Sequence, residues 1–136
     1  MIVTTPQAVA LIDAMKSLSF TRTVNLPVLG LIENMSGYVC PCCGEVSNLF
    51  SSGGGEEMAR REGLVFLGRL PVETELVTLL DAAEDAAQND GTENQEDFEL
   101  LLRYQRTSSA QLFKDISDRI LETLAMRIQP TTAEVK

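Results

Sequence analysis

The sequence predicts an α/β protein in which helices cover a partial parallel sheet. Two apolar segments, residues 1–5 and 28–32, have the composition of buried strands, and a segment with helical spacing lies between them. A strand, a helix and a strand in this order predict parallel pairing through a right-handed crossover. A third apolar segment, residues 64–67, follows a second predicted helix. The predicted order is therefore β-α-β-loop-α-β-α.

Each of the first two helices has its own start signal. The first is predicted to begin with Thr5 as N-cap and Pro6 at the first helical position. Its apolar residues at helical spacing are Ala8, Leu11, Ile12, Met15 and Leu18. The second helix, residues 56–62, follows three glycines, has two acidic residues in its first turn and ends at Gly63. Pro71 is predicted to break the third strand.

An acidic segment separates this core from the end of the chain. Residues 81–99 contain eight acidic residues and no basic one. The composition of residues 82–94 buries too little apolar surface to order itself, which favours a solvated, flexible linker over a docking site for a basic partner. Residues 98–104 are predicted to form a brief helical turn.

The final helix is predicted to cover one face of the sheet. Ser108 or Ser109 is its expected cap. Its apolar face consists of Leu112, Ile116, Ile120, Leu121, Leu124 and Ile128. The predicted organisation is a core over residues 1–81, an acidic insertion over 82–107, a C-terminal helix over 108–128 and a tail over 129–136.

Composition and charge exclude several classes of protein. The chain has 136 residues, a net charge of −9 and a pI near 4.4, which argues against a general nucleic-acid binder. No apolar run approaches the roughly 20 residues that span a membrane, and no leader suggests secretion. The three clustered cysteines are unlike a disulfide framework, so a reducing cytoplasm is expected. The absence of histidine excludes His–Cys zinc sites and histidine-based catalysis.

All three cysteines lie in one glycine-rich loop, residues 37–55. Cys40 and Cys43 form a Cys-x-x-Cys pair, which on a tight loop predicts soft ligands for a metal or a metal cluster. A single pair does not complete a four-thiolate site, but a two-fold dimer supplies the second pair. Zinc, in a dimerisation module, accepts the same four thiolates. Dithiol redox chemistry is less favoured, because no helix begins directly at Cys40.

Three other features of the loop have competing interpretations. Cys42 is interpreted as a surface thiol, and its use as an alternate ligand during transfer is the competing hypothesis. The glycines at 53–55 lack the lysine and Ser/Thr of a phosphate loop, which favours a flexible turn entering a helix. Asn34 follows a predicted strand at the edge where open α/β sheets bind ligands. A cap of the loop and a contact with a ligand both remain open for Asn34.

Together these motifs resemble the Mrp/Nbp-type P-loop NTPases that assemble iron–sulfur clusters. The residues that support the resemblance are Glu33-Asn34-Met35-Ser36, Cys40-Pro41-x-Cys43-Gly44, Phe50 and Gly53-Gly54-Gly55-Glu56, with Thr4-Thr5-Pro6-Gln7 and Leu67-Gly68-x-Leu70-Pro71. The resemblance is dense over residues 1–80 and favours the type that forms the smaller subunit of a cytosolic scaffold. It implies the C-terminal part of a SIMIBI-type fold similar to nitrogenase iron protein.

The resemblance also implies a function and a set of site residues. Members hold a labile 4Fe–4S cluster bridged between two subunits and transfer it to apo-proteins. Cys40 and Cys43 would be the cluster ligands, Asn34 would face the adenine base, and Pro71 would line the same pocket. The implied partners are a second copy through the cysteine loop, a homologous larger subunit, apo Fe–S proteins and transfer factors. Neither nucleic acid nor membrane is an expected partner.

This sequence departs from the family pattern in three places. The family's phosphate-binding glycine loop belongs before Met1 and does not occur in these 136 residues, so ATP and Mg²⁺ are expected only in a full-length parent and no ATPase activity is expected here. The acidic insertion replaces the short glycine-containing turn after Pro71. Cys42 adds a third thiol.

Overall fold

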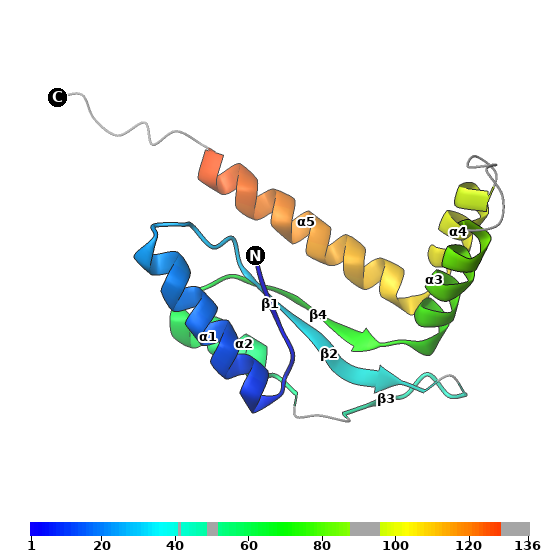
Figure 1. The fold of residues 1–136 in the computed structure, drawn as a ribbon, viewed down its shortest axis with the longest axis horizontal. Coiled ribbons are helices and arrows are strands. Elements are labelled where there is room, and N and C mark those ends of the chain that lie inside the picture. The colour runs from blue at the N-terminus through cyan, green and yellow to red at the C-terminus, as the bar shows by residue number, and fades with distance from the viewer. Residues whose placement is uncertain (41, 49–51, 88–95, 129–136) are drawn as a thin grey trace.

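The sheet is built around one central strand. A computed structural model describes residues 1–40, 42–48, 52–87 and 96–128 (Figure 1). Strand β2 (Leu31–Val39) pairs in parallel with β1 (Ile2–Thr4) and β4 (Phe66–Val72), and antiparallel with β3 (Val46–Ser47). The α/β class with a mostly parallel sheet is therefore confirmed. The antiparallel strand β3 was not predicted, and it forms because the chain turns back after β2.

Helices cover both faces of the sheet. Helices α1 (Ala8–Thr23) and α2 (Gly54–Glu62) lie on one face, and α5 (Ser108–Ile128) crosses the other (Figure 1). Alternate side chains of the strands supply the two cores. The core under α1 and α2 contains Ile2, Ala14, Leu18, Leu31, Met58 and Ala59. The core under α5 contains Ile32, Leu67 and Ile116, with Leu70 and Ile120 packed against it.

Two further helices lie side by side beyond the sheet, near the start of α5 (Figure 1). They are α3 (Thr74–Ala87) and α4 (Glu96–Tyr104). Helix α4 confirms the predicted helical turn. Residues 82–87 were expected in the linker but continue α3, so the composition of this segment did not end the helix. The rest of the predicted linker, residues 88–94, and the tail from 129 onward lie outside the described residues.

The start of α1 and its buried face differ from the prediction. Gln7, rather than Thr5, occupies the N-cap position, because Gln7 has an extended backbone with φ −69° and ψ 138°. Leu11, Met15 and Leu18 pack in the core under α1 and α2 as predicted, together with Ala14, which was not predicted. Ile12 was predicted on this face but is 56% exposed. The packed face is therefore only slightly rotated from the predicted one, because apolar residues also occur outside it.

Two later predictions also need correction. Strand β4 runs through Pro71 to Val72 instead of breaking there. This is possible because β4 pairs with β2 on one side only, and an edge strand tolerates a residue without an N–H. On α5, Ile116 and Ile120 reach the sheet, but Leu121 and Leu124 are exposed.

Candidate metal and nucleotide site

The cysteines lie at the tip of a hairpin that β2 and β3 form. Tyr38 pairs with Ser47 and Val39 with Val46, which extends regular structure into the predicted loop at both ends. Between them the Cys40 N–H donates to the Glu45 carbonyl (2.9 Å), and the Gly44 N–H donates to the Cys40 carbonyl (2.8 Å). These bonds close a tight turn. Gly44 has φ +71°, a left-handed conformation that glycine adopts without strain.

The three thiols differ in exposure. Cys40 is half-buried and Cys42 and Cys43 are exposed, and all three are free thiols. The backbone amide of Cys42, followed by the amide and side chain of Cys43, lowers the pKa of Cys40. These interactions favour the thiolate, which is the form that ligates metals. The turn is thus chemically suited to soft-metal binding.

One chain offers only part of a ligand set. Among the residues that the structure describes, no group of three or more His, Cys, Asp or Glu side chains is arranged to hold a metal ion. Cys40 and Cys43 therefore supply two of the four thiolates that a structural zinc or an iron–sulfur cluster prefers. The assignment of these two ligands remains a prediction.

A bulge in β2 sets the direction of the hairpin. Between Asn34 and Tyr38 the pairing with β4 shifts register, and Met35 and Gly37 have φ values of +55° and +96°. A bulge bends its strand and redirects the residues after it. A Cβ at Gly37 would lie 2.6 Å from Val46 Cγ1, so glycine is needed for β3 to approach this closely. The cysteine turn therefore follows a β-bulge in β2.

Glu33, which the sequence analysis assigned no role, connects this bulge to helix α2. The side chain is fully buried. Its Oε1 accepts hydrogen bonds from Ser36 Oγ (2.5 Å) and the Gly53 N–H (3.3 Å), and its Oε2 accepts from the Gly55 N–H (2.5 Å). The sequence did contain a signal for this role, because the glutamate directly follows two buried apolar residues of a strand. Such a residue needs internal hydrogen-bond partners.

The glycines before α2 make room for this carboxylate. Gly53 is the N-cap with φ +83°, and a Cβ at Gly55 would lie 2.9 Å from Glu33 Oε2. The predicted turn into a helix is therefore confirmed. The Glu33 carboxylate already occupies the start of α2, where it accepts from the Gly53 and Gly55 amides that a phosphate cradle would use.

Asn34 and Pro71 lie on neighbouring strands. Asn34 is paired with Leu70, so Pro71 is one position further along β4. Asn34 Oδ1 accepts a hydrogen bond from the Met35 N–H (2.9 Å), which is the local capping arrangement considered for it. The structure brings these two residues close in register at the same end of the sheet as the cysteine turn. Their contact with a nucleotide remains a prediction.

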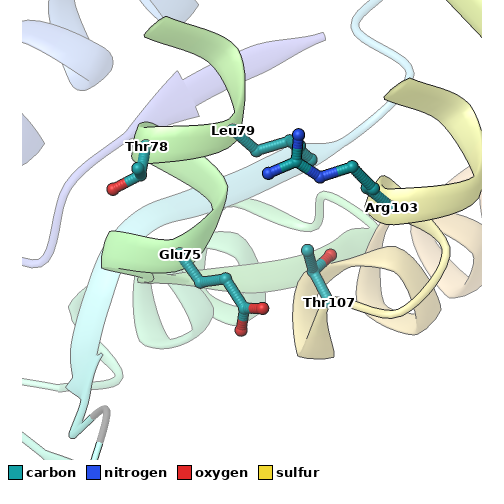
Figure 2. A pocket seen from close by; sticks show the side chains of 5 residues that line it. All are labelled: Glu75, Thr78, Leu79, Arg103 and Thr107. Atoms are coloured by element: carbon teal, nitrogen blue, oxygen red, sulfur yellow. The ribbon is translucent and has the colours of Figure 1, made fainter. Parts of the chain in front are cut away.

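An open hollow of about 540 Å³ adjoins the cysteine turn. Its lining includes Val39, Cys40 and Gly44 from the hairpin, the start of α3 at Thr74, and Arg106. A smaller hollow of about 230 Å³ shares Glu75 and Thr78 with the first. Figure 2 shows Arg103 extending from α4 across this second hollow toward α3, with Thr107 beside it. The sequence analysis did not identify either hollow.

Glu73 closes the first hollow on one side and holds the start of α5. It accepts hydrogen bonds from the backbone amides and the hydroxyls of Ser108 and Ser109. Burial raises the pKa of Glu73, whereas the hydrogen bonds from Ser109 and Ser108 lower it. The hydrogen bonds together outweigh the burial, so the pKa of Glu73 lies below its ordinary value. The predicted serine cap is thus replaced by a carboxylate that both serines contact.

No helix in the described part of the chain combines the length and apolarity needed to cross a bilayer.

Comparison with known proteins identifies relatives over most of the chain. The "Cytosolic Fe-S cluster assembly factor CFD1" of Mycosarcoma maydis is 60% identical over 85 residues, covering 62% of this chain and 24% of that protein. The "Cytosolic Fe-S cluster assembly factor NUBP2" of Bos taurus is 52% identical over 89 residues, covering 65% and 33%. The "Cytosolic Fe-S cluster assembly factor cfd1" of Aspergillus terreus is 42% identical over 132 residues, covering 88% and 42%. The chain thus spans less than half the length of these relatives.

A solved structure is also similar over part of the chain. It is the nucleotide-binding protein of Archaeoglobus fulgidus in complex with ADP, with 32% identity, 54% of this chain and 30% of that chain covered, and a TM-score of 0.47.

The family comparison covers more of the chain than most of these individual matches. The model described as "ParA: NUBPL iron-transfer P-loop NTPase" matches residues 1–104. This range includes the cysteine turn, Glu33 and the α3 residues that line the two hollows. The chain therefore belongs to the NUBPL-type iron-transfer P-loop NTPases.

Proposed function

We propose that this chain is part of a scaffold that holds a labile 4Fe–4S cluster as its cargo and transfers it to apo-proteins in the cytoplasm. The observation that carries the proposal is the pair of free thiols, Cys40 and Cys43, in a tight turn at the end of the central strand. The relatives are named cytosolic Fe–S cluster assembly factors, which supports both the cargo and the compartment.

Each chain contributes two thiolates and a second chain contributes the other two. An isologous contact through the cysteine turn brings the two pairs together around one cluster. A cluster prefers four thiolates, and in the described residues of one chain no group of three or more ligand side chains is arranged to hold a metal. A homodimer is the simplest assembly, and pairing with a homologous larger subunit uses the same half-site.

The geometry of the turn suits temporary rather than permanent holding. Cys43 is exposed and Cys40 only half-buried, so an apo-protein's thiols reach a cluster held here. The amides of Cys42 and Cys43 stabilise the Cys40 thiolate after the cargo leaves. This arrangement supports release by ligand exchange, in which incoming thiolates replace Cys40 and Cys43 one at a time.

Anaerobic reconstitution with iron and sulfide tests the proposal. The chain is expected to bind about four irons and four sulfides per dimer, with the visible absorption of a cluster. Cys40→Ala and Cys43→Ala are expected to lose the cluster and the dimer together. Cys42→Ala is the matched control, because it removes an exposed thiol of the same turn, and it is expected to bind iron as the parent does.

Three outcomes would contradict parts of the proposal. A colourless dimer that holds about one zinc and refuses iron would make the turn a structural clamp. A reversible Cys40–Cys43 disulfide with no metal uptake would indicate dithiol chemistry. Loss of iron from Cys42→Ala would contradict the ligand assignment.

We also propose that Asn34 and Pro71 contact the base of ATP in a full-length parent that carries the phosphate loop. Both residues lie on neighbouring strands toward the end of the sheet that carries the cysteine turn, and open α/β sheets bind ligands at the carboxyl ends of their strands. In a longer protein with that loop, Asn34→Ala is expected to raise the Kd for ATP about tenfold, by loss of one or two base contacts. The 136-residue chain alone is expected to hydrolyse no ATP, and activity that survives purification would overturn this.

A further inference from the structure

Glu33 holds both ends of the segment that carries the cysteines. The segment between the bulge of β2, which begins after Asn34, and the start of α2 at Gly53 carries Cys40 and Cys43. Glu33 bonds Ser36 near the outgoing end and Gly53 and Gly55 at the returning end. These contacts are separated by 20 and 22 residues in the chain for the two glycines. One carboxylate therefore closes the base of the whole segment.

The contacts of Glu33 are all of one chemical kind. Ser36 Oγ and the two glycine amides all act as donors, and the carboxylate is acceptor-only. The Ser36 and Gly55 bonds are buried and short, at 2.5 Å, so their loss is costly, whereas the Gly53 bond is longer, at 3.3 Å, and part-buried. The Ser36 bond holds the bulge that redirects β2, and the glycine bonds hold the start of α2. The direction of the hairpin depends on both.

We infer that Glu33 is a positioning residue for Cys40 and Cys43, and that it controls how firmly their cargo is held. The inference rests on the proposed function. Glu33 does not touch the thiols in this structure. It acts through the bulge at Ser36 and through the anchored return at Gly53, in the way that outer partners orient the direct ligands of metal sites.

The decisive variant is Glu33→Gln in the 136-residue chain. Glutamine has the same size, but its amide has only one acceptor oxygen. Its N–H₂ group therefore faces either the Ser36 and Gly53 donors or the Gly55 donor, and it cannot accept their hydrogen bonds. After anaerobic reconstitution with iron and sulfide, an iron chelator is expected to remove the cluster about tenfold faster than from the parent. The far-UV circular dichroism at the assay temperature should match the parent.

A second measurement does not depend on the cargo. In the metal-free chain, hydrogen exchange of the Gly53 and Gly55 amides is expected to accelerate in Glu33→Gln, while amides at the centre of α5 keep their rates. Ser36→Ala is the milder variant in case Glu33→Gln does not fold. It removes one donor and keeps the charge, and the chelator is expected to act roughly fivefold faster.

Leu18→Ala is the control for general destabilisation. Leu18 is buried in the core on the α1 face, and its truncation is expected to lower the denaturation midpoint at least as much as Ser36→Ala. It should leave the chelator rate unchanged. Equal acceleration in Leu18→Ala would overturn the positioning role, and so would parent-like cluster retention in both Glu33→Gln and Ser36→Ala. A parent chain that takes up no cluster contradicts the proposed function, a result distinct from both of these.

Discussion

Two buried glutamates anchor helices in this molecule, and they do so with different consequences. Glu33, in the central strand, accepts from Ser36, Gly53 and Gly55. Glu73, directly after β4, accepts from the amides and hydroxyls of Ser108 and Ser109. Both carboxylates satisfy the free amides at a helix start, α2 and α5 respectively.

The difference lies in where their partners come from. The partners of Glu73 are Ser108 and Ser109, which are 35 and 36 residues away, so this side chain joins the end of β4 to the start of α5. The partners of Glu33 lie on both sides of the cysteine turn, so this side chain closes the segment that carries the cysteines. The same chemistry is thus architectural in one place and linked to the proposed function in the other. Substitutions can separate the two roles.

The largest effect is expected from Glu33→Ala. It leaves the Ser36 hydroxyl and two glycine amides buried without a partner and opens a cavity beside Leu31. We expect it to lower the free energy of unfolding by about 3 kcal/mol or more. Chemical denaturation measures this. Glu73→Ala is the matched comparison, and a greater loss there would contradict the ranking drawn from the complete burial of Glu33.

Glu73→Gln is expected to cost about 1–2 kcal/mol at neutral pH and to change the pH dependence of stability. Because the folded-state pKa of Glu73 is lowered from 4.5, its charged form stabilises the fold above that pH. This contribution is lost as the pH falls through the lower folded-state pKa. The stability difference between parent and variant should therefore shrink in acid. A difference that stays constant down to strongly acidic pH would refute the assignment.

Ser36→Ala and Ser108→Ala form a matched pair with a smaller effect. Each removes one hydroxyl that donates to a buried carboxylate, at 2.5 Å and 2.7 Å respectively. Both are expected to lower the free energy of unfolding by about 1 kcal/mol. Only Ser36→Ala should accelerate hydrogen exchange at Gly53. Acceleration in Ser108→Ala as well would show that the two anchors are coupled.

The smallest effect is expected from Arg69→Ala, outside both anchors. Arg69 forms an ion pair with Glu56 in the first turn of α2, and both side chains are largely exposed. Surface pairs of this kind contribute about 0.5 kcal/mol, and less at high salt. Thermal melts at low and high salt measure it. A larger loss would indicate that α2 depends on its surface contacts as well as on Glu33.

The same contrast separates what the sequence predicts from what it does not. Cys40 and Cys43 form a local motif, Asn34 follows a recognisable apolar segment, and Pro71 is a candidate through the family resemblance, so the sequence identifies all four as candidates. Glu33 makes its glycine contacts 20 and 22 residues away, and no local pattern encodes that distance. A buried glutamate within a strand also contradicts the usual preference of that residue for the surface.

Tertiary packing explains the other differences between the sequence-based predictions and the structure. Helix α1 also has apolar residues outside its buried face, including exposed Val9, Ile12 and Phe20, so periodicity predicted most of that face but wrongly included Ile12. The antiparallel strand β3 has only two residues, too short for an alternating pattern to reveal it. Its position depends on the close approach to Gly37, a contact made by the folded chain.

Pro71 has a further consequence for the outer edge of β4. An edge strand offers unpaired backbone donors on which another chain can add a strand, which is how many sheets begin to aggregate. Proline has no backbone N–H, so β4, which pairs only with β2 among the described strands, has one donor fewer to offer although the strand does not end there. The residue that the resemblance assigns to ligand binding would therefore also make the addition of a strand at β4 less favourable.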